Sequence, residues 1–172
     1  VVFSPLPLSP LPSPVPGDWP VPPLVRSGDF GWTCIHDYDI DALQLFRMDG
    51  GAQPQLAASF PGYGIWIYDF GLHHWTQIHN LCSALDRVDL DGDGRENLVL
   101  FFPGYGLYWW EQQHGYQLIR AGTITQMTRV DLDGDERQEV AFSVVQDSLP
   151  GLYIYSETAR GAELKHLHSL DA

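Results

Sequence analysis

Three aspartates, Asp89, Asp91 and Asp93, occupy alternate positions in the string DLDGDGREN, and a glycine follows both the second and the third. Carboxylates this close together repel one another unless a cation lies among them. The glycines allow positive φ, so the loop can curl and turn its carboxylates inward. Oxygen ligands in a flexible loop suit Ca²⁺, which takes six to eight oxygens at about 2.3–2.6 Å. We therefore predict a calcium site, with the Arg95 carbonyl and the Asn97 amide oxygen as further ligands.

The string DLDGDERQE repeats this pattern 42 residues later. The matching ligands are Asp131, Asp133, Asp135, the Arg137 carbonyl and Glu139. Glu136 replaces the glycine that follows the third aspartate, and a non-glycine residue is strained if its φ is positive. We therefore predict a second calcium site that is weaker than the first.

An EF-hand loop begins in the same way, but it needs a bidentate Glu at its twelfth position and a helix on each side. The twelfth position is Leu100 in one copy and Phe142 in the other, and each lies in an apolar run. These residues exclude an EF-hand. The alternative that remains is a pair of solvated acidic turns that hold no metal.

A second marker repeats with the same period. The string FPGYGIWIY begins at Phe60 and returns as FPGYGLYWW at Phe102, again 42 residues later. Two independent markers with one period indicate an internal repeat. Three units follow, at about residues 39–80, 81–122 and 123–168.

Each unit is typical of short β-strands. Apolar runs follow the aspartate loops directly, namely NLVLFF and EVAFSVV, and these suit strands buried on both faces. Glycine-initiated aromatic runs come next, in GIWIYD, GLYWWE and GLYIYS. Further strands fit WTQIHN, YQLIRA, ELKHLHSL and MTRVDL, and no segment is typical of a helix. We therefore predict an all-β fold of about three four-stranded antiparallel β-propeller blades; the alternative, a β-solenoid, usually has far shorter coils.

Three blades do not close a propeller, which typically needs four to eight. The string GDFGWTCIHDYD loosely resembles part of the first unit and suits the tail of another blade. We expect a longer propeller, a ring completed by further copies, or an open arc with covered ends.

The chain divides into residues 1–24, a proline-rich linker or tail, and residues 25–172, the repeat domain. The first segment holds nine of the thirteen prolines, a density that neither helix nor sheet tolerates. It favours extended polyproline II, and an alternative role is to bind an aromatic groove.

The composition limits the partners. There are 22 acidic and 9 basic residues, a formal charge of −13, which argues against nucleic acid or an anionic membrane as partner. No apolar run approaches the roughly 20 residues that span a bilayer. No initiating Met or leader is present, so we expect that a signal was removed or that this is part of a longer protein. Cys34 and Cys82 are predicted to be buried free thiols rather than a disulfide.

The D-x-D-G-D pattern, the Asn or Glu four residues after its last aspartate, and the glycine-initiated aromatic strand resemble the FG-GAP or VCBS-type repeat of calcium-binding β-propellers. That family includes the head of integrin α-chains, many secreted bacterial and fungal proteins and some lectins. The resemblance covers about residues 39–168 and is specific in the second and third units. It implies that the ligands named above bind calcium there. In the first unit Arg47 and Gly51 replace two aspartates, so we expect no calcium and hypothesise that Arg47 pairs with Asp49.

Histidines offer the main alternative site. His73, His74 and His79 cluster in the first unit, and His166 and His168 are expected to share one face of a strand, a spacing that suits Zn²⁺. We favour exposed polar residues instead, because no matching carboxylate or Cys recurs nearby. No nucleophile elbow, H-E-x-x-H motif or phosphate-binding glycine loop is present, so we predict no enzymatic activity.

A calcium-stabilised binding module for adhesion or protein interaction is the leading prediction. The first alternative is a lectin in which Tyr63, Tyr105, Trp109 and Trp110 stack on sugars, although packing between blades is the favoured role for these rings. The second alternative is a propeller belonging to a secreted hydrolase or lyase. Extracellular calcium sites are weak, with Kd about 10⁻⁴–10⁻³ M, so we predict secretion or surface display.

Overall fold

The computed structural model describes residues 26–27, 33–51, 53–81, 84–145, 147–158 and 160–169. Within these ranges the chain forms fourteen β-strands and no helix, so none of the described segments is a candidate membrane-spanning helix. The proline-rich segment 1–24 and Cys82 lie outside the described residues.

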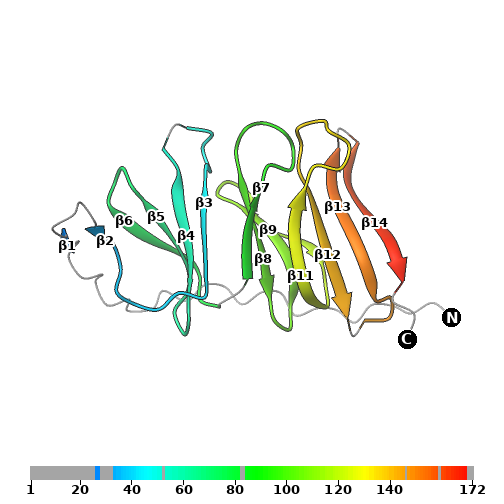
Figure 1. Ribbon diagram of the computed structural model, residues 1–172, viewed down its shortest axis with the longest axis horizontal. Helices are drawn as coiled ribbons and strands as arrows, with labels where there is room; N and C mark the ends of the chain where they lie inside the picture. The colour runs from blue at the N-terminus through cyan, green and yellow to red at the C-terminus, as the bar shows by residue number, and fades with distance from the viewer. Residues whose placement is uncertain are drawn as a thin grey trace.

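Twelve of the strands build three four-stranded antiparallel sheets, each with its strands in chain order (Figure 1). The first sheet contains β3 (Ala42–Phe46), β4 (Gln55–Phe60), β5 (Gly64–Asp69) and β6 (His74–His79). The second contains β7 (Ala84–Val88), β8 (Asn97–Phe102), β9 (Gly106–Glu111) and β10 (Gly115–Arg120). The third contains β11 (Thr123–Val130), β12 (Glu139–Val145), β13 (Gly151–Thr158) and β14 (Gly161–Ser169). A short hairpin, β1 (Arg26–Ser27) with β2 (Thr33–Cys34), precedes them.

The repeated F-P-G-Y-G string forms the turn between the second and third strands of the first two sheets. Gly64 and Gly106 begin the third strands with positive φ, at 86° and 126°. A Cβ at Gly64 would collide with the His79 carbonyl, and a Cβ at Gly106 would collide with the Arg120 carbonyl. Only glycine lets the third and fourth strands approach this closely, which explains why the string recurs with the sheets.

The sheets stack face to face, with β3 beside β7 and β7 beside β11 (Figure 1). One apolar cluster lies between the first and second sheets and contains Phe46, Ala57, Ile65, Ile67, Leu85, Leu98, Leu100, Phe102, Tyr108 and Trp110. Another joins the second and third sheets and contains Val88, Leu90, Val99, Leu107, Ile119, Ile124, Val140, Phe142, Val144, Tyr153 and Tyr155. The pairing of the strands confirms the prediction of an all-β fold built from antiparallel four-stranded sheets. The two clusters show that each sheet shares a core with its neighbour.

The two end faces of the stack differ. The outer face of the first sheet carries a third cluster, with Leu56, Ala58, Phe60, Trp66, Tyr68 and Trp75, against which Ile35 packs. On the third sheet, β12 alternates between buried and half-buried residues. The expectation that EVAFSVV is buried on both faces is therefore wrong, because no described sheet covers the outer face of β12.

The cysteine expectation also needs correction. Cys34 is a free cysteine, as expected, but it is exposed rather than buried. It lies in the short strand β2, and its thiol contacts the carbonyl of His36 at 3.2 Å. A two-stranded hairpin is too small to bury its own side chains.

Leu100 tests the first interface, because it is fully buried between two sheets. We expect Leu100→Ala to lower the free energy of unfolding by about 2–5 kcal/mol through lost contacts and a cavity. Urea denaturation measures this loss. Leu118→Ala, at a side chain that is 47% exposed on β10, should change stability by no more than about 0.5 kcal/mol. Equal losses in both variants would contradict the stacked arrangement.

Candidate metal centre

Two aspartate loops lie along one edge of the stack. The first joins β7 to β8, and the second joins β11 to β12; in Figure 1 both are at the upper edge, beside the loop that joins β3 to β4. Each loop connects the first and second strands of its sheet. Because the first strands lie side by side, neighbouring loops are also brought together.

The first loop turns its three carboxylates inward. Asp89 accepts hydrogen bonds from the amides of Gly92 at 2.8 Å and Gly94 at 3.0 Å. Asp91 accepts one from the amide of Asp93 at 3.2 Å. One oxygen from each of the three aspartates lies within 4.8 Å of the others. The backbone amides thus fix the carboxylates at one point, as the sequence predicted.

The second loop repeats this arrangement. Asp131 accepts from the amide of Gly134 at 2.7 Å, and Asp133 accepts from the amide of Asp135 at 3.2 Å. The three carboxylates again bring oxygens within 4.8 Å of one another. Glu136 has φ of 75°, close to the 81° of Gly94 at the same place in the first loop. The strain expected at Glu136 is therefore present.

The surroundings of Asp89 disfavour its ionised form. Burial raises the pKa of Asp89 above its usual value, and the charges of Asp91 and Asp93 raise it further. The amides of Gly94 and Gly92 oppose this rise, but they do not cancel it. A carboxylate with a raised pKa is destabilised when it is ionised, and a bound cation would relieve that cost.

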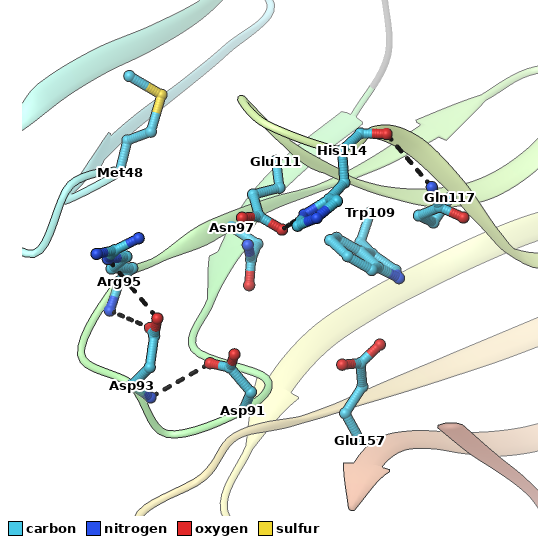
Figure 2. A pocket seen from close by; sticks show the side chains of 10 residues that line it. All are labelled: Met48, Asp91, Asp93, Arg95, Asn97, Trp109, Glu111, His114, Gln117 and Glu157. Carbon is cyan, nitrogen blue, oxygen red and sulfur yellow. Dashed lines mark hydrogen bonds and ion pairs between the residues drawn. The ribbon is translucent and has the colours of Figure 1, made fainter. Parts of the chain in front are cut away.

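The residue at the ninth position of each loop carries a side-chain oxygen that was predicted to be a metal ligand. Asn97 is half-buried, and Figure 2 shows its amide oxygen directed toward Asp91 and Asp93. Glu139 is buried, and one of its oxygens accepts from the amide of Leu132 at 2.9 Å. That bond leaves its other oxygen for a ligand role. Asn97 thus faces its triad, whereas Glu139 is not among the carboxylates that gather within 4.8 Å in the second loop.

The side chains of the two arginines whose carbonyls were predicted as ligands lie near the last aspartate of their own loop and against a glycine of the preceding loop. Arg95 lies 3.7 Å from Asp93, and Arg137 lies 4.0 Å from Asp135. A Cβ at Gly92 would approach the Cγ of Arg137 at 2.9 Å, so the second loop's arginine lies across the first loop. Glycine is therefore favoured at position 92 for two reasons: its φ is positive, and a Cβ would crowd the Arg137 side chain.

Sequence reasoning missed the residues that connect the loops. The amide of Gln138 donates to the Asp89 carbonyl at 2.9 Å, and the Gln138 side chain accepts from the Asp89 amide at 3.3 Å. Glu96 forms the same pair of bonds with Arg47, at 2.8 and 2.7 Å. Each loop therefore holds the first residue of the preceding loop. The shared spacing of 49 residues is the signal that could have revealed these pairs.

The first unit does not contain the hypothesised ion pair. The described contacts include no bond between the Arg47 guanidinium and Asp49, and Asp49 instead accepts from the amide of Gly51 at 2.9 Å. Gln55, at the ninth position, accepts from the amide of Met48 at 3.2 Å. This loop has one aspartate in place of three, so it lacks the repulsion among three carboxylates that a cation would relieve.

The histidines do not gather into one site. His73 and His74 are exposed, whereas His79 is buried against Phe102, with ring centroids 4.6 Å apart, so its predicted exposure is wrong. His166 pairs with Tyr153 and His168 with Leu152, two neighbours whose side chains point to opposite faces. A β-bulge between these pairs shifts the alternation, so the two histidines do not share a face.

The aromatic candidates divide into three environments. Trp110 is buried in the core, and Tyr105 packs against the same cluster. Tyr63 is exposed. Trp109 lines a cleft of about 390 Å³ with Asn97, next to the first aspartate loop (Figure 2). Tyr63 lines a separate hollow of about 340 Å³ with Asp37 and Asp39, so Trp109 and Tyr63 both lie beside polar groups, and Trp109 lies next to an aspartate triad.

No family model, curated protein or solved structure matches this chain. The atoms of the two loops nevertheless limit which metal they can hold. Each triad offers carboxylate oxygens and neither thiolate nor imidazole, a donor set that favours Ca²⁺ or Mg²⁺ over Zn²⁺. Ligands on opposite sides of one Ca²⁺ lie about 4.6–5.2 Å apart, twice the usual bond length, and the oxygens of each triad fit within that span. The residues present therefore fit calcium.

Glu136 and Gly94 allow a test of the loop backbone. We expect Glu136→Gly to raise stability by up to about 1 kcal/mol and Gly94→Glu to lower it by about 1–2 kcal/mol, because positive φ strains any residue with a Cβ. Urea denaturation in EDTA measures both changes. Gln113→Gly, at a turn residue without positive φ, should lower stability slightly. A loss of stability in Glu136→Gly would contradict this account of the second loop.

Proposed function

We propose that this chain is a calcium-stabilised β-propeller module of the FG-GAP or VCBS type that binds a protein or glycan outside the cell. The observation that carries the proposal is the pair of aspartate triads, placed at one phase of the repeat and on one edge of the stack. Asp89, Asp91, Asp93 and Asn97 would hold one ion. Asp131, Asp133, Asp135 and Glu139 would hold another, and the Arg95 and Arg137 carbonyls would complete the two sites.

Calcium would supply positive charge to both loops, and its role would be structural. In its absence the ionised carboxylates oppose the fold that brings them together. Bound calcium would convert this repulsion into attraction at both loops. Because Gln138 also holds the backbone of Asp89, order in one loop supports order in the next.

The proposed location follows from calcium supply. Exposed oxygen sites of this kind resemble extracellular modules, whose Kd values are about 10⁻⁴–10⁻³ M. The cytosol holds too little calcium to fill such sites, whereas extracellular fluid holds enough. Secretion or surface display with an adhesive or protein-binding role is therefore the function that best uses these loops.

A lectin is the second candidate, and the cleft at Trp109 favours it. Trp109 is half-buried, which leaves part of its ring for stacking, and Glu111, His114 and Gln117 add hydrogen-bonding groups around it (Figure 2). Aromatic faces beside a few polar groups are typical of small-ligand sites. The equivalent strand positions in the other sheets are Ile67 and Ile154, so this strand position is aromatic in the second unit and aliphatic in the first and third.

Calcium should raise the melting temperature in proportion to site occupancy. At 10 mM free calcium, a Kd of 10⁻⁴–10⁻³ M corresponds to about 1.4–2.7 kcal/mol per site. Asp91→Asn should remove the larger part of this increase and Asp133→Asn the smaller part, because each variant loses the charge of one site and the second site is the weaker. Each asparagine retains a side-chain oxygen for its backbone bond. Differential scanning calorimetry with calcium and with EDTA measures the difference.

Asp49→Asn is the matched control, because Asp49 occupies the same place in the first unit's loop. Its response to calcium should equal that of the unmodified chain. A melting temperature that calcium and EDTA leave unchanged would refute the metal proposal. If Asp49→Asn reduced the calcium-induced rise in melting temperature as much as Asp91→Asn does, the rise would be due to general surface charge and not to the two sites.

A glycan array tests the lectin candidate. We expect a sugar signal that Trp109→Ala removes, while Tyr63→Ala, outside the cleft, leaves it unchanged. The calcium-dependent melting shift of Trp109→Ala checks that the variant remains folded. Absence of any array signal from folded protein would leave protein binding as the proposed role.

A further inference from the structure

The face of the first sheet that packs on the second sheet has a simple pattern of small and aliphatic side chains. Ala57 on β4 pairs with Ile67 on β5, and Ser59 pairs with Ile65. All four are almost fully buried. Their small side chains on β4 leave room for the bulky side chains of the second sheet.

The outer face of the third sheet carries the same pattern in the same register. Ala141 on β12 pairs with Ile154 on β13, and Ser143 pairs with Leu152. Here, however, Leu152 is 40% exposed. A hollow of about 370 Å³ lies at this face, lined by residues that include Ala141, Ser143 and Leu152. Ile154 is buried, but no described sheet covers this face of the third sheet, whereas the equivalent face of the first sheet is an interface.

The complementary pattern is also present twice. The second sheet meets the first with Leu98 paired to Trp110, Leu100 to Tyr108 and Phe102 to Gly106. The outer face of the first sheet has Leu56 paired to Tyr68, Ala58 to Trp66 and Phe60 to Gly64. Its side chains are bulky at four of the six positions, with Ala58 in the place of Leu100, and the final Phe–Gly pair is identical. The two ends of the stack therefore carry the two halves of the interface found inside it.

We infer that the open face of the third sheet docks on the first sheet of a second copy of this chain, head to tail. Such a contact repeats the packing between the first and second sheets with the same side-chain types. If two copies dock at both ends, the assembly contains six sheets, within the four to eight that a closed propeller uses. A heterologous contact that closes in this way limits its own growth.

A segment before β3 now occupies part of the receiving face, so docking must displace it. Ile35 packs on this face, and its carbonyl accepts from the Trp75 indole at 3.3 Å. The ring of His36 lies 4.5 Å from that of Phe60. These described contacts come from two residues, whereas the equivalent face of the second sheet is covered by a whole sheet. The apolar side chains of the receiving face are already 8% exposed or less, so the gain in apolar burial on docking comes from the third sheet, where Leu152 is 40% exposed.

Sedimentation velocity over a range of concentrations tests the inference. We expect a species of twice the 19.3 kDa chain mass. Leu152→Asp should leave only the monomer, because a charge then lies in the new interface. Leu72→Asp, at a turn residue that is 77% exposed, is the matched control and should form the dimer normally.

Ile35→Ala distinguishes head-to-tail docking from other arrangements. Because it weakens the covering segment, it should lower the dimer dissociation constant by about threefold or more. No change in Ile35→Ala would indicate that two open faces meet each other, and this result would overturn the head-to-tail arrangement. A protein that stays monomeric at all concentrations, or a dimer that Leu152→Asp leaves intact, would overturn the proposal entirely.

Discussion

Face-to-face packing of unlike sheet surfaces is the interaction on which this structure depends. A single four-stranded sheet from about 42 residues has no interior of its own, so each sheet gains a core only from its neighbour. Leu100 and Phe102 of one sheet fill the room that Ala57 leaves on another. Because the first strands then lie side by side, the same packing places the loops in a row. The candidate metal centre is therefore a consequence of the stack.

Hydrogen bonds between the loops also connect neighbouring sheets. Glu96 and Gln138 each hold both backbone groups of the first residue of the preceding loop. A loop that changes shape therefore moves the strand end next to it. Bonds of this kind are individually modest, about 0.5–1.5 kcal/mol each, but they join the edge of one sheet to that of the next. Charge in the loops consequently affects more than the loops themselves.

Most of the local structure could be predicted from the sequence, because the patterns involved are local. The glycines of the F-P-G-Y-G turn and the alternating aspartates determine backbone conformation within a few residues. Features that depend on contacts between distant parts of the chain could not be predicted from such local patterns. The bulge that separates His166 from His168 changes which face each occupies, and β12 is open on one side because nothing described covers it. The bonds of Gln138 connect two units. Arg47 bonds to Glu96 through its backbone and does not form the hypothesised ion pair with Asp49.

The substitutions among the three loops show how one backbone serves different electrostatic purposes. In the first unit Gln55 and Asp49 complete the loop with hydrogen bonds alone, so its geometry is stable without an ion. In the second and third units extra carboxylates occupy the same geometry, and the raised pKa of Asp89 shows the cost of ionising one of them there. A loop that needed only to turn would not require this repulsion, because the loop between β3 and β4 turns without it. Under the proposed function, the added aspartates make the order of these two loops depend on a cation.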